Sequence, residues 1–473
     1  MVALPVTPTR NVVVLGASYA GARAAELLSR TLPSTHRVVV IDRQSHFNHL
    51  YLHPRVSVVP GHAEKVFIPY SGVLPAPDPE NKPTLSRHVI VHASVTSINE
   101  DFIEVDRDLL ENERDLDGDE NEVSKLTDEL EAAKLEAPEE EKDPATRRLS
   151  WDYLIYSLGC TLPPPLVSDY ITKKAGVSFL EGQAKLISKA TKILVAGGGA
   201  LGVQYATDIA DLYNNDEHAE HTKKFTVDGK RPPKKEITLV HSRDRFLPLY
   251  KQEMHDEISR RMEELGVKVV LGERLNLPPM EEDEPGKMKK ITLRDGTEVE
   301  YDLLLRCTGQ KPNSDLFRGF LPEALDERGY ITIRPTLQVD ISKVPDHEEL
   351  SEKIQRNIYA IGDVAEAGVI KAGHTGWNQA GVAVQNVMCC VETDLANANL
   401  PEGEAASPPA LVAYEKSPPQ IKVTLGLTHS VSELLPAMDA KDTLIQVADN
   451  GPIDSYWAVV WTRMGADPED VSQ

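Results

Sequence analysis

Residues 10–42 read RNVVVLGASYAGARAAELLSRTLPSTHRVVVID. Residues 12–15 are a continuous apolar run, which is typical of a strand that is buried on both faces of a parallel sheet. Gly16 then allows a tight turn, GARAAELLSR has the apolar spacing of a helix, and HRVVVID is a second strand that ends at Asp42. The order strand, glycine turn, helix, strand predicts a doubly wound α/β domain.

The glycine turn has the features of a dinucleotide-binding site. Gly16 makes the turn, and Gly21 lets the following helix pack close to the sheet, so that free N–H groups at the helix N-terminus face a pyrophosphate. Ser18 replaces the middle glycine of the usual pattern and is small enough to admit the phosphates. Asp42 lies 26 residues after Gly16, where a carboxylate accepts hydrogen bonds from a ribose diol.

The chain then repeats this arrangement. KILVAGGGALG, residues 192–202, is a strand followed by all three glycines, Gly197, Gly199 and Gly202. Each copy continues with a helix, a second strand, a small antiparallel hairpin and a strand that ends in Gly159 or Gly309. Two dinucleotide-binding domains are therefore predicted.

The second copy differs where its second strand ends. His241, Ser242 and Arg243 stand where an NAD-binding domain usually has an acid, and Arg245 is close by. Cations at this position suit a ribose 2′-phosphate, and a missing carboxylate removes a repulsion against it. The pattern favours NADPH, or use of both cofactors, over strict use of NADH. The alternative is that the two arginines form surface ion pairs.

Two polar insertions interrupt the copies. Residues 101–150 carry 19 acidic and 7 basic side chains, and the segment of about residues 107–148 sits where the tip of the first hairpin is expected. We interpret it as a surface insertion, with an acidic docking segment for a basic partner as the alternative. The second insertion, residues 214–235, is mixed in charge and is also expected to be a loop.

A third signal lies further along the chain. Residues 357–368, NIYAIGDVAEAG, are a strand that ends in Gly362 and Asp363, and a helix-like run follows. After two dinucleotide folds, this pattern matches flavoproteins in which the aspartate contacts the ribityl and pyrophosphate part of FAD.

Composition excludes several classes of protein. The 473 residues include 51 basic and 74 acidic side chains, a net charge of −23, which disfavours nucleic acid as a partner. No run is apolar enough for a membrane span, although a peripheral membrane association stays compatible with the sequence. Four cysteines and no recognisable targeting signal lead us to expect a cytoplasmic protein rather than a disulfide scaffold.

The chain resembles the flavoproteins with two dinucleotide-binding domains, and among them the apoptosis-inducing-factor-like branch that includes AMID, the ferroptosis suppressor protein. GASYAG, GGGALG, LRCTGQKPN and YAIGDVAEAG carry the resemblance, which covers residues 11–463. It implies an FAD-dependent NAD(P)H oxidoreductase that passes hydride from nicotinamide to flavin and then electrons to a quinone-type acceptor. A signalling flavoprotein with structural FAD and a biosynthetic oxidoreductase acting on a dedicated metabolite remain as alternatives.

Two departures from the family pattern bear on the chemistry. Gln204 stands where the pattern usually has a glutamate that helps to position the nicotinamide. Disulfide reductases of this superfamily have a pair of cysteines two or four residues apart beside the flavin, and no two cysteines here have either spacing. Dithiol chemistry is therefore excluded, and because no attachment residue is recognisable, the FAD is expected to be noncovalent.

The segment after Asp42 is rich in histidine. His46, His49 and His53 lie within eight residues, and spacings of three and four could place them on one helical face. No cysteine or acid completes a metal site, so no metal is expected. In the resembled family this segment passes the flavin ring, which favours flavin or acceptor contact over a purely structural role.

These patterns predict four segments and two sets of binding residues. Residues 1–160 and 301–388 are predicted to form the FAD domain, residues 161–300 the NAD(P)H domain, and residues 389–473 a C-terminal α+β domain that covers the flavin. The predicted FAD contacts are Gly16, Ser18, Gly21, Asp42, Arg43, Val95, Gly159, Gly362 and Asp363. The predicted NAD(P)H contacts are Gly197, Gly199, Gly202, His241, Arg243 and Gly309. The candidates for a catalytic role are His49, His53 and Gln204.

Overall fold

The computed structural model describes residues 10–74, 88–107, 109, 147–226, 230–280, 284–401, 404–437 and 440–472. The chain forms two compact units, each assembled from separate segments. Unit 1 comprises Met1–Gln44, Val73–Gly159 and Pro312–Tyr414, and unit 2 comprises Ser45–Gly72, Cys160–Lys311 and Glu415–Gln473.

Unit 1 is built on a five-stranded parallel sheet in the order β19-β9-β1-β2-β5. The two strands predicted from residues 10–42 are its centre, and every residue of β1 after Arg10 is buried. The strands of this sheet are β1 (Arg10–Leu15), β2 (His36–Asp42), β5 (Val89–His92), β9 (Tyr153–Tyr156) and β19 (Ile358–Ala360).

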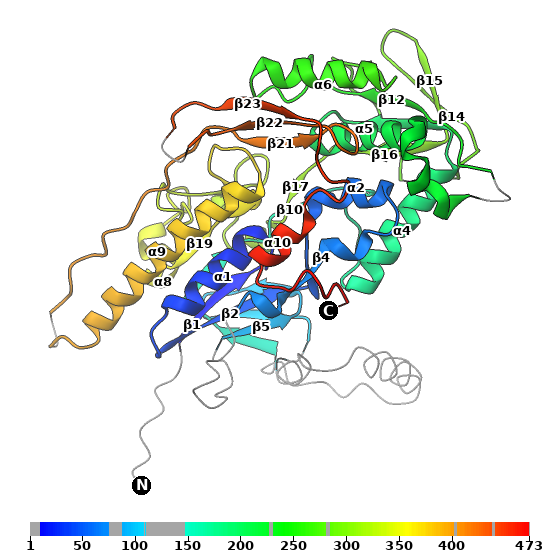
Figure 1. The fold of residues 1–473 in the computed structure, drawn as a ribbon. Helices are drawn as coiled ribbons and strands as arrows, with labels where there is room; N and C mark the ends of the chain where they lie inside the picture. Colours follow the sequence, from blue (N-terminus) through cyan, green and yellow to red (C-terminus); the bar gives the residue numbers. More distant parts are fainter. Residues whose placement is uncertain are drawn as a thin grey trace, which may run out of the picture. The chain divides into compact units, whose positions relative to one another are not determined.

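Two helices of unit 1 lie side by side, as Figure 1 shows for α1 and α9. The first follows the glycine turn, and the second follows Gly362 and Asp363, as the sequence predicts. The described helices of unit 1 are α1 (Tyr19–Thr31), α7 (Asp315–Phe320), α8 (Glu352–Arg356) and α9 (Gly373–Asn397), with the short 3-10 turns η7 (Pro322–Ala324), η8 (His347–Glu349) and η9 (Gly362–Val364).

A three-stranded antiparallel sheet of unit 1 shows where the acidic insertion enters. Its strands are β6 (Val95–Ile98), β7 (Phe102–Val105) and β8 (Arg148–Ser150), and Glu104 of β7 pairs with Arg148 of β8. The segment of residues 107–148 thus joins the two strands of one hairpin, as predicted. Most of the insertion lies outside the described residues. Strands β18 (Ile331–Thr332) and β20 (Ala365–Glu366) complete the unit.

Unit 2 repeats the central motif with a four-stranded parallel sheet in the order β13-β12-β11-β16. The second predicted hairpin is present, and its turn closes at Gly296, whose N–H donates to the Leu293 carbonyl. These elements are β11 (Lys192–Ala196), α5 (Ala200–Asn214), β12 (Glu236–Val240), α6 (Gln252–Glu264), β13 (Lys268–Val270), β14 (Lys289–Thr292), β15 (Glu298–Tyr301) and β16 (Leu303–Arg306).

The remaining elements of unit 2 come from three parts of the chain. The C-terminal antiparallel sheet β21-β22-β23 packs against α5 and α6 (Figure 1). The elements are β3 (His46–Asn48), η1 (Leu50–Leu52), α2 (His53–Val58), η2 (Ala63–Val66), β4 (Phe67–Pro69), η3 (Tyr70–Gly72), α4 (Lys173–Lys189), β21 (Ile421–Thr424), β22 (Ser430–Leu434), β23 (Leu444–Ala448) and α10 (Trp457–Arg463). Two short strands, β10 (Cys160–Thr161) and β17 (Lys311–Pro312), lie where the chain passes between the units.

The structure differs from the sequence expectations in two places. The second polar insertion is not simply a loop, because residues Asp216–Phe225 form the 3-10 helix η6, followed by Lys235, which is buried. The units also divide the chain differently from the predicted domains: Ser45–Gly72 and Glu415–Gln473 group with unit 2, while α9 stays whole in unit 1. The assignment of FAD and NAD(P)H to the two units remains a prediction at this point.

Candidate functional site

The first glycine turn lies at the carboxyl end of β1. Gly16 has a positive φ of 91°, and its N–H donates to the Ile41 carbonyl at 2.8 Å. The next N–H, of Ala17, donates to the Asp42 carboxylate at 2.6 Å. Burial raises the pKa of Asp42, and the N–H groups of Ala17 and Gln44 oppose that rise. The carboxylate thus fixes the turn while it stands at the predicted ribose position.

Helix α1 crosses directly over this turn, which explains the need for glycine at position 21. A Cβ on Gly21 would lie 1.8 Å from the Gly16 carbonyl oxygen and 2.5 Å from Ser157 Oγ. Ser157 Oγ is itself fixed, because it donates to the Leu15 carbonyl at 2.7 Å. No side chain fits at residue 21 unless the turn moves.

The N-termini of the two helices that follow the glycine turns are suited to an anion. Ser18 is the N-cap of α1 and Gly199 that of α5, and neither supplies a side-chain cap. Neither helix has an acidic residue in its first turn. Each helix N-terminus therefore carries the positive end of the helix dipole with no acidic side chain against it, which is an arrangement that suits a pyrophosphate.

The second turn repeats the hydrogen-bond pattern of the first, with an imidazole nitrogen in place of the carboxylate oxygen. Gly197 has a φ of 115°, and its N–H donates to the Val240 carbonyl at 2.8 Å. The next N–H, of Gly198, donates to Nδ1 of His241 at 3.0 Å. A Cβ on Gly202 would lie 1.9 Å from the Gly197 carbonyl oxygen. The predicted duplication therefore extends to the contacts that hold each turn.

The third sequence signal joins the first turn within unit 1. Gly362 follows β19, and its N–H donates to Oε1 of Gln379 on α9 at 2.7 Å. A Cβ on Gly376 of α9 would lie 3.0 Å from the Cβ of Ala20, so the two helices approach closely here. Asp363 is half-buried in η9 beside this contact. Gln379 is a residue that the sequence analysis missed, since a glutamine within a helix carries no signal by itself.

The other predicted contacts stand at strand ends or at the surface. Gly159 and Gly309 follow β9 and β16 with positive φ values of 63° and 85°. Val95 begins β6 and is half-buried, whereas the side chain of Arg43 is exposed. The two glycines and Asp42 thus lie at the carboxyl ends of parallel strands, where α/β sheets bind ligands.

The two arginines after β12 have different surroundings. Arg245 is held within its own loop, because its guanidinium donates to Gln252 Oε1 and to the carbonyls of Pro248 and Tyr250. Three of its N–H groups are thus used within the loop, and a contact of Arg245 with a 2′-phosphate stays a prediction. Arg243 is exposed, and no residue in the described ranges forms an ion pair or hydrogen bond with its guanidinium.

Gln204 lies on α5, one turn after the second glycine turn. Its Nε2 donates to Thr424 Oγ1 at 3.1 Å, and the side chain is half-buried. The amide is thereby oriented by the C-terminal sheet. Its carbonyl oxygen remains the group with which it can accept a hydrogen bond from a ligand amide.

The histidine-rich segment does not form one helix, so the expectation of a shared helical face is wrong. His46 lies in β3, His49 precedes η1, and His53 begins α2. The His49 ring stacks on Phe47 at 6.4 Å and meets the edge of Tyr51 at 6.1 Å. Within the described ranges, no group of three or more histidine, cysteine or acidic side chains is placed to hold a metal ion.

His49 and His53 are buried and uncharged at neutral pH. Burial lowers the pKa of His49 to about 3 and that of His53 to about 4. Nδ1 of His53 donates to the Leu166 carbonyl at 3.0 Å, which helps to hold the ring in place. Because neither ring is an imidazolium near pH 7, these histidines are better suited to contacting or positioning a ligand than to donating a proton to it.

We expect the two histidines to make unfolding easier in acid. A histidine whose folded-state pKa lies below its unfolded value of about 6.5 stabilises the fold fully above that pH, and the contribution falls as the pH drops towards the folded pKa. For His53 the loss is about 1.4 kcal/mol per pH unit between about 6.5 and about 4. Urea unfolding at a series of pH values from 7.5 to 4.5 measures how steeply the free energy of unfolding changes with pH.

The matched variant is His53→Asn, whose amide N–H can replace the Nδ1–H donor. In this variant the free energy of unfolding should depend less steeply on pH over this range, by the equivalent of about one proton taken up on unfolding. The contribution of His49 should remain. An unchanged slope would show that His53 is protonated in the folded protein.

Arg55 is the residue whose role the sequence analysis missed most clearly. Its guanidinium is 3% exposed and forms a bidentate pair with the fully buried Asp208, at 2.8 and 2.9 Å. Its other N–H groups donate to the carbonyls of Gly426, Leu427 and Ile453. All five donors are used. Arg55 therefore joins α2 to α5 and to the C-terminal segment inside unit 2. The one feature of the sequence that could have indicated this role is the position of an arginine within an apolar run.

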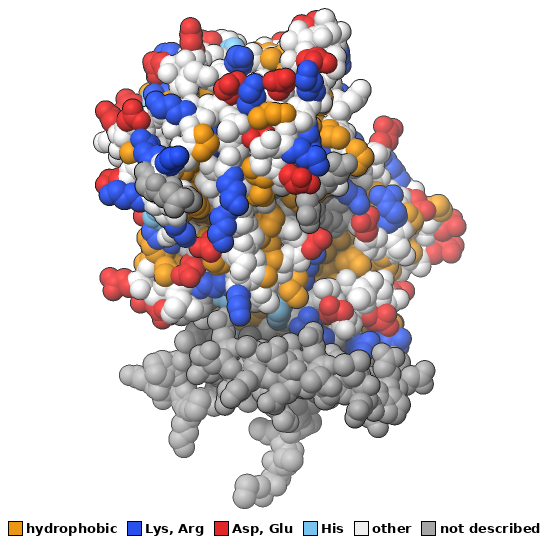
Figure 2. Space-filling view, turned by 90° about the vertical axis from the view of Figure 1, so that its right-hand side faces the viewer, with side chains coloured by type: hydrophobic (Ala, Val, Ile, Leu, Met, Phe, Trp, Pro, Cys, Tyr) orange, Lys and Arg blue, Asp and Glu red, His pale blue; other side chains and the backbone are white. Residues whose placement is uncertain are grey.

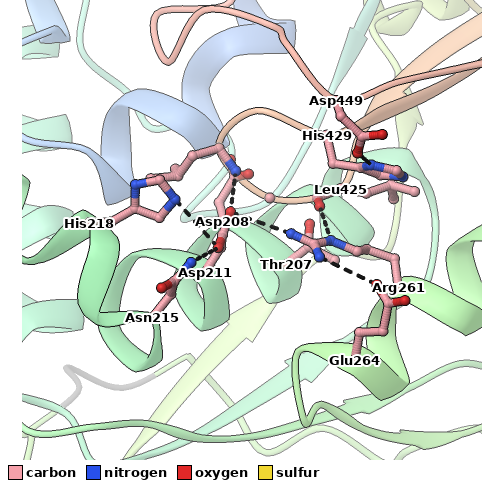
Figure 3. A network of polar contacts seen from close by, with 12 residues as sticks. Thr207, Asp208, Asp211, Asn215, His218, Arg261, Glu264, Leu425, His429 and Asp449 are labelled. Carbon is pink, nitrogen blue, oxygen red and sulfur yellow. Dashed lines mark hydrogen bonds and ion pairs between the residues drawn. The ribbon is translucent and has the colours of Figure 1, made fainter.

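A wider polar network attaches the same C-terminal segment to α5 and α6 (Figure 3). Asp211 accepts the Leu427 N–H at 2.8 Å, and Arg261 donates to the Leu425 carbonyl at 3.1 Å. His429 lies between two carboxylates: Nε2 is 2.6 Å from Glu257, and Nδ1 is bonded to Asp449. The β21–β22 connection is thus held firmly beside the helix that carries Gln204.

One face of the molecule mixes the two signs of charge. On the face drawn in Figure 2, Lys and Arg side chains alternate with Asp and Glu side chains, and hydrophobic atoms lie among them. Among the described helices, none is both long and apolar enough to cross a membrane.

Comparison with known proteins agrees with this geometry. Residues 10–386 match the family model described as pyridine nucleotide-disulphide oxidoreductase. Fe-regulated protein 8 of Mycosarcoma maydis is 34% identical, over 98% of this chain and 97% of that protein. Ferroptosis suppressor protein 1 of Mus musculus is 29% identical, over 51% of this chain and 57% of that protein.

A similarity to solved structures concerns the fold. The NAD-dependent persulfide reductase of A. fulgidus superposes with a TM-score of 0.56 at 16% identity, over 90% of this chain and 64% of that chain. The predicted α/β fold class and the resemblance to the branch that includes the ferroptosis suppressor protein are confirmed.

Proposed function

Because this chain belongs to the pyridine nucleotide-disulphide oxidoreductase family, we propose that it oxidises NAD(P)H by way of bound FAD and passes the electrons to a quinone-type acceptor. The observation that carries the proposal is the duplicated turn, in which Gly16 with Asp42 and Gly197 with His241 are held by equivalent contacts. Two such turns in one chain suit two dinucleotides.

We assign FAD to unit 1 and the nicotinamide cofactor to unit 2. In unit 1, Asp42 stands ready for a ribose diol, and Gly362 with Asp363 lies beside the first turn, as in flavoproteins. In unit 2, the residue directly after β12 is His241 rather than a carboxylate, and Arg243 is exposed and unpaired within the described ranges. Bound FAD and NAD(P)H supply the hydride chemistry; the protein supplies position and electrostatics.

The protein groups have separate tasks in this proposal. The helix N-termini at Ser18 and Gly199 hold the pyrophosphates. Thr424 orients the Gln204 amide, which supports Gln204 as the residue that accepts a hydrogen bond from the nicotinamide amide. No side chain acts as a covalent nucleophile. All four cysteines are free, and no pair has the spacing of a redox dithiol, which supports an acceptor other than a disulfide and suits a reducing, cytoplasmic compartment.

For the acceptor, we propose the aromatic segment around His49 as the contact surface. Phe47 and Tyr51 flank the His49 ring. Phe47 and His49 are buried, so Tyr51, which is 39% exposed, is the side chain of this group at the surface. Flat aromatic side chains and an uncharged imidazole suit a flat, weakly polar acceptor such as a quinone. The test is steady-state oxidation of NADPH with a soluble short-chain quinone or with oxygen alone. Turnover at least ten-fold above the oxygen rate is expected, and equal rates would refute the quinone assignment.

We expect Arg243 to favour the phosphorylated cofactor. A charge-assisted hydrogen bond to phosphate contributes about 1.5–3 kcal/mol, which is roughly ten- to a hundred-fold in affinity. Arg243→Ala should raise the KM for NADPH by that factor and leave the KM for NADH nearly unchanged. Steady-state kinetics with both cofactors checks this.

The control is Arg294→Ala, which removes an exposed arginine at the hairpin turn of the same unit. It should change neither KM. A wild-type preference for NADH, or an equal effect of Arg243→Ala on both cofactors, would mean that Arg243 is only a surface charge.

A further inference from the structure

The turn between β21 and β22 is the part of the C-terminal sheet that contacts Gln204. Thr424 ends β21 and pairs with Ser430 of β22, so residues 425–429 form the turn between them. The hydroxyl oxygen of Thr424 accepts the Gln204 amide at 3.1 Å. The next N–H after Thr424 donates to the His429 carbonyl at 2.9 Å. The position of His429 is therefore coupled directly to that of the residue that orients Gln204.

The imidazole of His429 is buried between two carboxylates, as Figure 3 shows for Asp449. The residue is 4% exposed. Its Nε2 lies 2.6 Å from Oε1 of Glu257 on α6, and its Nδ1 is bonded to Oδ1 of Asp449, which directly follows β23. An ionised carboxylate only accepts, so both ring nitrogens must donate, and the ring that makes both hydrogen bonds is an imidazolium. A neutral ring would point a lone pair at one of the two oxygens.

The charges around the ring favour this protonated form. Glu257 also accepts from the guanidinium of Arg260, at 2.5 Å. The hydrogen bonds from Arg260 and His429 lower the pKa of Glu257, in opposition to its partial burial, so this partner is a carboxylate. Arg261, next along α6, donates to a carbonyl at the other end of the turn. The side chain of Asp449 is 81% exposed. His429 is thus the cation that links α6 to the end of β23.

We propose that His429 is a positioning residue for hydride transfer: as an imidazolium between Glu257 and Asp449, it holds the β21–β22 turn where Thr424 orients Gln204. This rests on the proposed function, in which Gln204 accepts a hydrogen bond from the nicotinamide amide. Among residues 425–429, His429 alone has an ionisable side chain. Loss of its proton removes one of the two hydrogen bonds and sets a lone pair against a carboxylate, which loosens the turn. The orientation of Gln204 then depends on pH.

Anaerobic rapid mixing of the FAD-loaded protein with NADPH separates the limiting rate of flavin reduction from the dissociation constant of NADPH. The amide of His429→Asn reaches the position of Nδ1 but not that of Nε2, so it loses the bond to Glu257. The limiting rate should fall about ten-fold, because the nicotinamide is misplaced, while the dissociation constant changes less than about two-fold. In a Gln204→Ala background the same change should have almost no effect, because the residue through which it acts is gone.

The pH profile supplies a second readout. The limiting rate of wild type should fall as the pH rises from about 6 to about 9.5, and that of His429→Asn should change less, because asparagine has no proton to lose. The control is His347→Gln, which replaces a half-buried histidine in η8 of unit 1. It should leave the limiting rate, the dissociation constant and the pH profile as in wild type.

The other outcomes separate this proposal from the proposed function. A limiting rate in His429→Asn equal to that of wild type, or a fall that is as large in the Gln204→Ala background, overturns the positioning role. If His429→Asn loses its flavin or unfolds early in a thermal scan, Asp449→Ala takes its place, since it removes one hydrogen bond at an exposed carboxylate. A smaller fall that is absent in the Gln204→Ala background is then expected, and an unchanged rate overturns the proposal. A wild-type flavin that NADPH reduces at no pH would instead refute the proposed function.

Discussion

Gly21→Ala is expected to yield protein without flavin. The added Cβ would lie 1.8 Å from the Gly16 carbonyl oxygen, which is backbone and cannot swing aside. The turn would have to move by more than an ångström, and with it the Ala17 N–H that Asp42 holds at 2.6 Å. Such overpacking costs about 1–3 kcal/mol or more in stability and removes the pyrophosphate site. The ratio of flavin to protein absorbance after purification measures the loss.

Three further substitutions make this result specific. Gly381→Ala on α9 adds a Cβ that meets nothing within 4 Å, so it should keep its flavin. Gly202→Ala, with its Cβ 1.9 Å from the Gly197 carbonyl oxygen, should keep flavin but lose NAD(P)H binding. Gly182→Ala on α4 is its matched control, since the space there is open. Flavin loss in Gly202→Ala and retention in Gly21→Ala would reverse the assignment of the two units.

Arg55→Met is expected to destabilise the protein by about 3–5 kcal/mol. The change leaves Asp208 buried without its partner, and burial already raises the pKa of that carboxyl. It also leaves the Gly426, Leu427 and Ile453 carbonyls without their donors. Urea unfolding at pH 7, with flavin fluorescence and circular dichroism as separate probes, measures the change.

The matched comparison is a double variant, Arg55→Met with Asp208→Leu. Because no charge is then left buried, it should recover a large part of the lost stability. Arg260→Met removes an exposed arginine from ion pairs on α6 and should cost less than about 1 kcal/mol. If Arg55→Met costs no more than Arg260→Met, the buried pair does not hold the C-terminal segment.

The core of the fold was predictable because its signals are local. A run of buried strand residues, a glycine turn and a helix are adjacent in sequence, and the same pattern occurs twice. Gly21 and Gly202 could be assigned from spacing, since the crossing of helix and strand fixes where a side chain cannot fit. The tip of the first hairpin was predicted at about residues 107–148 by comparison with the second copy, and the structure pairs Glu104 with Arg148 there.

What could not be predicted depends on contacts between distant segments. Arg55 pairs with a residue 153 positions away, and nothing near it in sequence identifies that partner. Spacing alone does not show that Pro248 and Tyr250 already use donors of Arg245. The sequence already placed His241 at the position of the usual acid. That its Nδ1 accepts the N–H of Gly198, as the Asp42 carboxylate accepts that of Ala17, became visible only in the structure.

The central claim is that the flavin of this protein accepts electrons from a nicotinamide cofactor. Anaerobic mixing of the purified FAD-loaded protein with a slight excess of NADPH, followed at the main visible flavin absorbance band, tests it most directly. We predict rapid bleaching in wild type, slower bleaching with NADH, and none in Gly202→Ala. A wild-type flavin that stays oxidised with both cofactors would contradict the claim and would indicate a structural flavin.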